Sequence, residues 1–271
     1  MKALKDALLK LGIQAGDVIL THSSFKSLAG IVSGAQSVVD AMLETVGADG
    51  TVVFPTLCSD NWDKVYENWH LDAKSDVGYL TNYFRKLPGA IRSNQATHSV
   101  AAMGKEAKYI TKTHGKSGLR YGIYGDTPFA ADSPWEKLYN LDAKVIFIGV
   151  GLRKCTLRHY AEYVFMEKYL NKAKQSPDYE ALKSRIWCYA RWNDGGVWPN
   201  VENEYVHEVL DKRGKVHYAQ CGEAKLLAVS AKDFVDCALE LLEKRDARVF
   251  RTDDGSNPQA TLAWLAEIDR I

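Results

Sequence analysis

Four residues with reactive side chains stand close together in the segment CTLRHYAEYVF, residues 155–165. They carry the thiol of Cys155, the hydroxyl of Thr156, the imidazole of His159 and the carboxylate of Glu162. The last three recur every three residues, which places them on nearly one face of a helix. A histidine in this setting can act as a general base near neutral pH. A carboxylate would orient its ring, and a hydroxyl would donate a hydrogen bond to a developing oxyanion.

The same spacing also fits a structural interpretation. A threonine at the start of a helix often serves as its cap, and a lone histidine on a helix is often structural or solvated. Cys155 and His159 stand at positions i and i+4, which suits two metal ligands, but no third ligand is indicated and no metal is expected. The stretches GVGLRK and HGKSG each lack a glycine that a nucleotide-binding loop requires, so neither fingerprint is complete.

Composition excludes several classes of protein. The chain has 271 residues, a formal net charge of +1 and 46% hydrophobic residues, so a single domain over residues 1–271 with a sizeable core is expected. Its near-neutral charge gives no sign of a nucleic-acid or membrane-surface partner. No signal peptide and no apolar run of membrane-spanning length is recognised. The five cysteines are scattered without a CxxC pair, so we expect a cytoplasmic protein with reduced thiols.

The reactive segment follows one of several strand-like runs that alternate with helix-like runs. DVILTHSS, GTVVFPT, HSVAAMG and KVIFIGVG read as strands, and the segments between them have helical spacing or helix-start signals, such as SPWEKLYNL. This rhythm predicts an α/β fold with a mixed, largely parallel central sheet flanked by helices. Ligands in such folds bind at the carboxyl ends of strands. The polar clusters THSS, PTLCSDNW and GLRKCT are therefore expected at one site.

The pattern changes after about residue 170. SRIWCYARW alternates like an antiparallel strand, EYVHEVLDKRG is helical, and AKLLAVSAKDFVDCALELLEKR reads as a strand followed by a helix. Residues 169–271 are therefore expected to form a smaller antiparallel β-containing portion. No stretch of flexible composition separates it from residues 1–168, so both are expected to pack as one unit.

Five motifs appear in order between about residues 10 and 165: LTHSSFKSLAGIVSGAQSVVDAML, GTVVFPT, IRSNQATHSVAAMG, YGDTPFAADSPWEKL and VIFIGVGLRKCTLRHYAE. Together they resemble the aminoglycoside 3-N-acetyltransferase family. The resemblance implies acetyl transfer from acetyl-CoA, as co-substrate and without a metal, to an amine of an aminoglycoside or another amino-sugar acceptor. It also implies that His159 is the general base and Thr156 its hydroxyl partner. Glu162 is a supporting residue, and His98 is either a second histidine of the site or a structural one.

The same resemblance implies that residues 1–168 are the CoA-binding and catalytic core and that residues 169–271 lie on the acceptor side. It also implies where acetyl-CoA is held. Backbone groups after the first predicted strand would line the thioester and pantetheine arm and supply oxyanion donors, and a neighbouring strand would flank the same arm. Lys26 and Arg92 are the expected phosphate partners. The full set of expected cofactor-binding residues is Ser23, Ser24, Phe25, Lys26, Ser27, Arg92, Ser99, Val100 and Ala101.

The acceptor is expected to meet the acidic and aromatic segment SDNWDKVYENWHLDAKSD. Its carboxylates would attract a cationic amino sugar, and its aromatic faces would pack against sugar rings. The expected substrate-binding residues are Asp60, Trp62, Tyr66 and Asp72. A small-molecule amine is therefore the expected partner, and a homodimer is left open.

Three alternatives stay open at this point. The neutral chain and the segment RWNDGGVW fit an amino sugar carried on a nucleotide or in a polysaccharide, or a small metabolite amine, equally well. Transfer through an acyl-Cys155 intermediate is a formal rival to direct attack by the amine. A non-catalytic CoA- or sugar-binding homologue is the third alternative, although the retained Thr156 and His159 argue against it.

Overall fold

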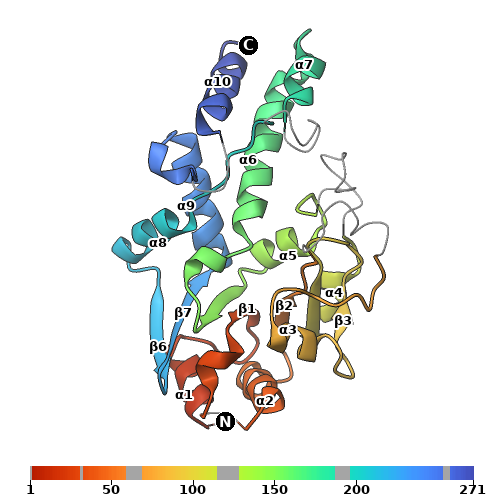
Figure 1. Cartoon of the computed structure of the whole chain (residues 1–271), viewed down its shortest axis with the longest axis vertical. Helices are drawn as coiled ribbons and strands as arrows, with labels where there is room; N and C mark the ends of the chain where they lie inside the picture. Colours follow the sequence, from red (N-terminus) through yellow and green to blue (C-terminus); the bar gives the residue numbers. More distant parts are fainter. Residues whose placement is uncertain (1, 31–32, 59–68, 115–127, 187–195, 253–256) are drawn as a thin grey trace.

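The computed structural model describes residues 2–30, 33–58, 69–114, 128–186, 196–252 and 257–271. Within these residues, seven strands form one central sheet (Figure 1). They are β1 (Val18–Ser23), β2 (Thr51–Pro55), β3 (Ile91–Arg92), β4 (Val100–Gly104), β5 (Lys144–Ile148), β6 (His217–Cys221) and β7 (Ala224–Ser230). Their order across the sheet is β3–β4–β2–β1–β5–β7–β6.

The centre of the sheet is parallel and its margins are antiparallel. β1 pairs in parallel with β2 on one side and with β5 on the other. The pairs β2–β4, β3–β4, β5–β7 and β6–β7 are antiparallel. The predicted mixed α/β sheet is confirmed, and its parallel pairs involve the three strands that end in the polar clusters. Of the strands expected after residue 168, AKLLAVS forms β7, and β7 with its antiparallel partner β6 extends the same sheet beyond β5.

The three central strands are buried on both faces, which explains their nearly unbroken apolar sequences. Successive side chains of a strand point to opposite faces of the sheet. In β1, Ile19 therefore joins one core cluster and Leu20 the other, and Ile146 and Phe147 of β5 divide in the same way. Both faces anchor these strands, so their carboxyl ends are held at fixed positions.

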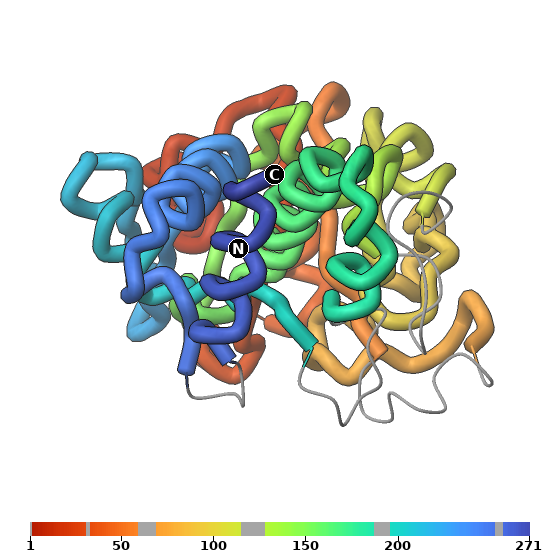
Figure 2. The backbone as a smooth tube through the Cα atoms, turned by 90° about the horizontal axis from the view of Figure 1, so that it is seen from above, coloured from red at the N-terminus to blue at the C-terminus, as the bar shows by residue number. Residues whose placement is uncertain are grey.

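Helices cover both faces of the sheet. They are α1 (Lys2–Lys10), α2 (Ala35–Val46), α3 (Tyr79–Phe84), α4 (Ala107–Thr111), α5 (Pro134–Asn140), α6 (Arg158–Lys172), α7 (Tyr179–Ser184), α8 (Asn203–Lys212), α9 (Ala231–Glu243) and α10 (Pro258–Asp269). Side chains of α1, α2 and α3 join the core cluster on one face, and those of α4 to α10 join the cluster on the other. On that second face α6 packs along α9 (Figure 2). None of the helices in the described ranges is long and apolar enough to cross a membrane.

Local sequence signals set several helix starts. Ser133 caps α5, since its hydroxyl accepts a hydrogen bond from the Glu136 N–H at 3.2 Å, and Pro134 occupies the first turn as predicted. The helix expected from about Thr156 begins at Arg158. Three elements, β3, α7 and β6, were not predicted. The segment SRIWCYARW lies largely outside the described residues, and its Ile186 forms an isolated parallel bridge with Val197.

Candidate active site

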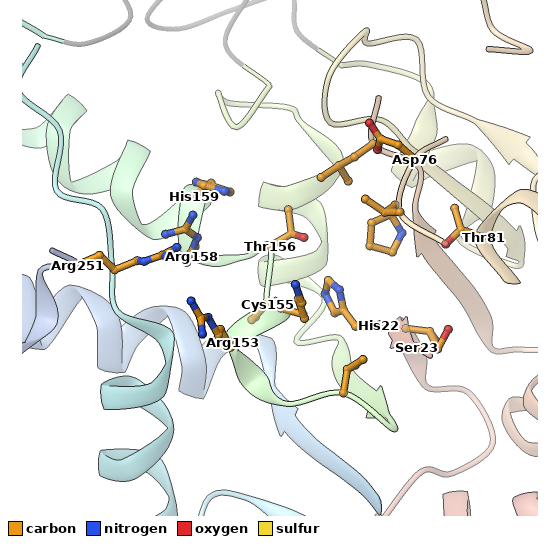
Figure 3. Close-up of a pocket in the computed structure, with 16 residues that line it drawn as sticks. His22, Ser23, Asp76, Thr81, Arg153, Cys155, Thr156, Arg158, His159 and Arg251 are labelled. Atoms are coloured by element: carbon orange, nitrogen blue, oxygen red, sulfur yellow. The ribbon is translucent and has the colours of Figure 1, made fainter. Parts of the chain in front are cut away.

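A cavity of about 590 Å³ opens at the carboxyl ends of the three parallel strands (Figure 3). Its wall combines residues from the end of β1, from the chain just after β2 and from the connection between β5 and α6. These are the three positions at which the polar clusters follow the predicted strands. Thr21, His22, Ser23, Pro55, Leu57, Cys155, Thr156 and His159 are among the lining residues.

The turn after β5 requires glycine. Gly149 has a φ of +63°, and a Cβ atom at this position would lie 1.9 Å from the Ser27 hydroxyl oxygen. A larger residue would therefore be strained and would also clash with the loop that follows β1. The close approach of the two loops brings Ser23 and the β5–α6 connection to one cavity.

His159 and Glu162 form a hydrogen-bonded pair in this wall. Nδ1 of His159 lies 2.8 Å from Oε2 of Glu162. The carboxylate accepts, so Nδ1 carries the proton and Nε2 keeps its lone pair. The His159 side chain is 26% exposed, and the ring lines the cavity. The predicted spacing of three residues thus produces a histidine whose tautomer is fixed by a carboxylate.

Glu162 is fully buried and is held by donors far away in the sequence. Its Oε2 also accepts from Trp198 Nε1 at 3.0 Å, and its Oε1 accepts from the Val201 N–H at 2.8 Å. The Arg158 guanidinium lies 3.6 Å from Oε1. Burial alone would raise the pKa of Glu162, but its interactions with His159, Arg158 and Val201 hold that pKa at about 2. The carboxylate is therefore ionised at neutral pH.

His159 is neutral at the same pH. Burial lowers the pKa of His159 below its ordinary value, and the Arg158 guanidinium lowers it further, while Glu162 opposes both effects. Thr156 lies one helical turn earlier and also lines the cavity, with 8% of its surface exposed. The backbone links the two, since the His159 N–H donates to the Thr156 carbonyl at 3.1 Å. A neutral imidazole and a hydroxyl are therefore presented to one space.

Cys155 has the environment of a structural thiol. Burial raises the pKa of Cys155 to about 12, although the backbone N–H groups of Leu157 and Arg158 donate to its sulfur. The thiol is thus protonated at neutral pH and a weak nucleophile. The Cys155 carbonyl accepts from Asn203 Nδ2 at 3.1 Å, which ties this turn to α8. This environment disfavours the acyl-cysteine route.

His98 lies beside the base. Its ring centroid is 5.6 Å from that of His159 in an edge-on arrangement, and Phe129 packs against both rings. Its Nδ1 lies 2.8 Å from the Thr97 hydroxyl. Burial lowers the pKa of His98 well below its ordinary value, and His159 lowers it further. His98 is not among the described residues that line the cavity, and its ring packs against that of His159.

The residues expected along the pantetheine arm lie near the cavity only in part. Ser23 lines it, and Ser24 and Phe25 follow in the adjoining turn, where Phe25 packs on Tyr79 at 5.1 Å. The Ser27 hydroxyl donates to the Ser24 carbonyl at 2.7 Å, and Lys26 is exposed. The Ser24 N–H donates to the Ile148 carbonyl at 2.8 Å. This corrects the expectation that it serves as an oxyanion donor, because the β1–β5 pairing already uses it.

Arg92 has protein partners in place of the expected phosphate. Its Nε donates to the hydroxyls of Thr56 and Ser99, both at 3.1 Å. Its terminal nitrogens donate to three backbone carbonyls, those of Leu71, Ala73 and Thr56. These bonds occupy the guanidinium, and Arg92 is only 9% exposed. Ser99, Val100 and Ala101 are fully buried in or beside β4, so their placement gives no support to a direct contact with the cofactor arm.

The expected acceptor residues fall in two groups. Asp60, Trp62 and Tyr66 lie outside the described residues. Asp72 is exposed and stands away from the cavity wall, and its carbonyl accepts from Arg85 at 3.1 Å. The carboxylate that does line the cavity is Asp76, from the same acidic segment.

Sequence reasoning missed several residues of the wall. Four cations, Arg153, Lys154, Arg158 and Arg251, line the cavity, with Arg251 contributed by the C-terminal portion (Figure 3). His22 also lines it and was visible only as the second letter of THSS. In the described ranges no cluster of three or more His, Cys, Asp or Glu residues is arranged to hold a metal ion.

The geometry of this site is compatible with general-base chemistry. A neutral histidine oriented by a buried carboxylate, at the carboxyl edge of an α/β sheet, is suited to removing a proton from a nucleophile as it attacks. No metal or nucleophilic thiolate is needed for that step.

Comparisons with known proteins identify the family of this chain. A family model described as aminoglycoside 3-N-acetyltransferase matches residues 20–243. An aminoglycoside N(3)-acetyltransferase III of Salmonella is 28% identical, over 90% of this chain and 91% of its own. A prophage-derived aminoglycoside N(3′)-acetyltransferase-like protein of Bacillus subtilis is 28% identical, over 63% of this chain and 68% of its own. The chain therefore belongs to the aminoglycoside 3-N-acetyltransferase family and is an acyltransferase.

Solved structures share the fold. AAC-IIIb in a binary complex with CoASH matches with a TM-score of 0.68 and 21% identity, covering 93% of this chain and 98% of its own. AAC-VIa with bound sisomicin matches with a TM-score of 0.67 and 21% identity, covering 90% of this chain and 97% of its own.

Proposed function

We propose that this protein transfers an acetyl group from acetyl-CoA to an amine of an amino-sugar acceptor by direct attack, with His159 as the general base. The observation that carries the proposal is the His159–Glu162 pair. The bond from Nδ1 to the carboxylate, 2.8 Å long, fixes the ring and leaves Nε2 as the proton acceptor in the cavity wall.

The reaction balances with these groups alone. The amine nitrogen bonds to the thioester carbonyl carbon, and the carbonyl electron pair moves onto its oxygen. His159 takes the amine proton at Nε2, and the ionised Glu162 stabilises the resulting imidazolium. The oxyanion then collapses, the carbon–sulfur bond breaks, and the proton held by His159 passes to the departing CoA thiolate. The products are an acetamide and CoASH.

The environment of His159 suits this task. A base must be unprotonated before it acts, and burial keeps its pKa below the ordinary value. Glu162 then makes proton uptake favourable during the attack. A general base of this kind contributes about 10²–10⁴-fold to the rate. Thr156, beside His159, can donate its hydroxyl to the oxyanion.

The choice of acetyl-CoA and of an aminoglycoside acceptor is supported by relatives. The Salmonella relative is an aminoglycoside N(3)-acetyltransferase, and the two structural neighbours hold CoASH and sisomicin. In this chain the turn from Ser23 to Ser27 stands beside the cavity, where backbone groups can meet the pantetheine arm. Asp76 in the wall offers a carboxylate to a cationic amine.

A second candidate acceptor is favoured by the charge of the wall. Arg153, Lys154, Arg158 and Arg251 line the same cavity as His159 and Asp76. Arg158 is partly balanced by Glu162 at 3.6 Å, and Arg251 by Glu202 at 3.8 Å. Among the described lining residues these four cations outnumber the one carboxylate, Asp76, and this excess of positive charge would repel a polycation and attract an anion. An amino sugar that carries a phosphate, such as a nucleotide-linked one, fits this wall better than a free polycationic aminoglycoside.

The test is thiol release from acetyl-CoA, with product mass measured for polycationic aminoglycosides and for nucleotide-linked amino sugars. His159→Ala should lower kcat by about 10²–10⁴-fold. His207→Ala is the matched control, since this histidine contacts Tyr218 at 2.9 Å and is not among the lining residues. Full activity in His159→Ala would remove the assigned base. CoA binding without turnover of any acceptor would favour a non-catalytic homologue.

The panel also separates the two acceptors. If the cationic wall selects an anionic acceptor, Arg153→Gln should raise the KM for nucleotide-linked amino sugars and leave the KM for acetyl-CoA unchanged. A parallel rise in the KM for acetyl-CoA would instead assign the wall to the phosphates of the cofactor.

A further inference from the structure

His22 is a cavity residue that the steps above do not use. It stands at the penultimate position of β1, and its ring lies nearly flat on Phe147 of β5, with centroids 5.1 Å apart and planes inclined by 12°. The residue is 9% exposed, so strand and stacking partner fix its orientation. The ring lines the same cavity as Thr156 and His159 (Figure 3).

The Nε2 atom of His22 is buried and has no hydrogen-bond partner in the described structure. Buried polar atoms in native proteins are nearly always paired, and one left unpaired is destabilising. Such an atom in the wall of a cavity has a natural partner in the ligand that fills the cavity. The orphan nitrogen therefore points to a contact with substrate.

Several backbone N–H groups around the cavity are already hydrogen-bonded within the protein and cannot donate to a substrate. The tetrahedral intermediate needs hydrogen-bond donors aimed at its oxygen. The N–H of Ser24 is bound to Ile148, that of Cys155 to Leu152, and that of His159 to Thr156. The Ser23 hydroxyl, the Thr156 hydroxyl, the four cations and the His22 ring also line the cavity and can donate. Of these groups, the imidazole of His22 is the one whose nitrogen is buried without a partner in the described structure.

We infer that His22 is a further catalytic residue, whose Nε2–H donates a hydrogen bond to the acetyl carbonyl oxygen and stabilises the oxyanion formed when the amine attacks. This inference rests on the acetyl transfer proposed above. No proton is transferred to or from His22. Its N–H bond stays intact while the carbonyl oxygen gains and then loses negative charge.

The environments of the two histidines assign them different roles. His159 has a buried carboxylate on Nδ1, which makes proton uptake favourable. His22 has an aromatic face instead, and burial lowers its pKa to about 3. A neutral imidazole with so low a pKa is a poor base near neutral pH but remains a competent donor.

The test compares three substitutions of His22 by steady-state kinetics and thermal unfolding. His22→Phe keeps the stack on Phe147 and removes the nitrogen. His22→Gln extends an amide N–H to about the reach of Nε2, whereas His22→Asn reaches only as far as Nδ1. Loss of one oxyanion donor lowers kcat by about 10²–10³-fold, so this loss is expected in His22→Phe and His22→Asn. His22→Gln should recover about tenfold or more of it, with the KM for acetyl-CoA nearly unchanged in all three.

The outcomes separate the inference from the proposed function. An equal loss of kcat in His22→Gln and His22→Asn would overturn the inference and would mean that His22 only packs against its neighbours. The comparison of these two variants is decisive even if His22→Phe fails to fold. A raised KM for acetyl-CoA with unchanged kcat would overturn it in favour of plain cofactor binding. Wild-type kcat in His22→Phe would also overturn it. Wild-type turnover is measured first, and its absence with every acceptor would overturn the proposed function itself together with this inference.

Discussion

Two regions at the carboxyl edge of the sheet each contain a buried ion, Glu162 in α6 and Arg92 in β3. Glu162 is 0% exposed and Arg92 is 9% exposed. Arg92 gives every nitrogen to a protein acceptor, so nothing remains for a ligand. Glu162 instead orients His159, whose other nitrogen keeps a lone pair beside the cavity. By this difference, burial of a charge does not by itself mark a candidate site. A nitrogen that stays available to a ligand, such as Nε2 of His159, is the more specific sign.

The largest effect expected from this comparison is in Glu162→Gln. The amide keeps the shape of the carboxylate but cannot stabilise an imidazolium or enforce the tautomer of His159. We expect kcat to fall by about 10²–10⁴-fold while acetyl-CoA still binds. Steady-state kinetics and calorimetry of CoA binding would measure this. Glu208→Gln is the control, since this exposed carboxylate of α8 forms a surface ion pair with Lys212, away from the cavity. Undiminished turnover in Glu162→Gln would mean that the pair is structural, like Arg92.

The next largest effect is expected on the stability of the protein, from substitution of Arg92. Arg92→Met leaves the carbonyls of Leu71, Ala73 and Thr56 without their donor. We expect the free energy of unfolding to fall by about 3 kcal/mol, because buried acceptors lose charge-assisted hydrogen bonds. Urea unfolding would show it. Arg213→Met, which removes only a surface ion pair with Glu240, should change that energy by less than about 1 kcal/mol.

The kinetics of the Arg92→Met protein test the same assignment. If Arg92 is structural, folded Arg92→Met should keep the wild-type KM for acetyl-CoA, since no phosphate is lost as a partner. A large rise in that KM with unchanged stability would restore the phosphate role that the sequence predicted.

The contrast between these regions also explains what the sequence could predict. The edge that carries the site followed from three polar clusters after three apolar strands, and the His159–Glu162 pair followed from helical spacing. The donors that hold Glu162 did not, because Trp198 and Val201 lie 36 and 39 residues further along the chain, with no local signal. The charge of Arg92 is visible in the sequence, but its partners are not. Only packing shows that they are already taken.

His22 illustrates the same limit from the other side. The letters THSS mark a polar strand end, but they do not say which polar atom is paired. The significance of the His22 nitrogen depends on a missing partner, which is a property of the whole fold.

The pH dependence of the reaction gives a smaller and more specific effect. His159 must be neutral to act, and its pKa lies below the ordinary value of about 6.5, chiefly through burial and then through Arg158. As the pH falls, kcat/KM should therefore decline along an acid limb whose apparent pKa lies below that ordinary value. Arg158→Met removes one of the causes, so the acid limb should move to higher pH, towards the ordinary value. An acid limb at or above pH 6.5 in the wild type would contradict a buried base. The Arg213→Met protein should keep the wild-type profile.

The smallest effect is expected from substitution of Cys155. Although this residue lies next to Thr156, its reactive atom is buried and bound by protein groups, as that of Arg92 is. Its sulfur accepts from two backbone N–H groups at the start of α6, and burial raises its pKa to about 12, so the thiolate needed for acyl transfer is scarce. A serine at this position can accept the same hydrogen bonds. Cys155→Ser should therefore keep kcat within about threefold of the wild type, because an essential acyl-accepting nucleophile would lose far more. Intact-mass measurement of the wild type with acetyl-CoA alone should show no added acetyl group. An acetylated Cys155, together with an inactive serine variant, would identify this thiol as the nucleophile. The transfer would then be a two-step reaction.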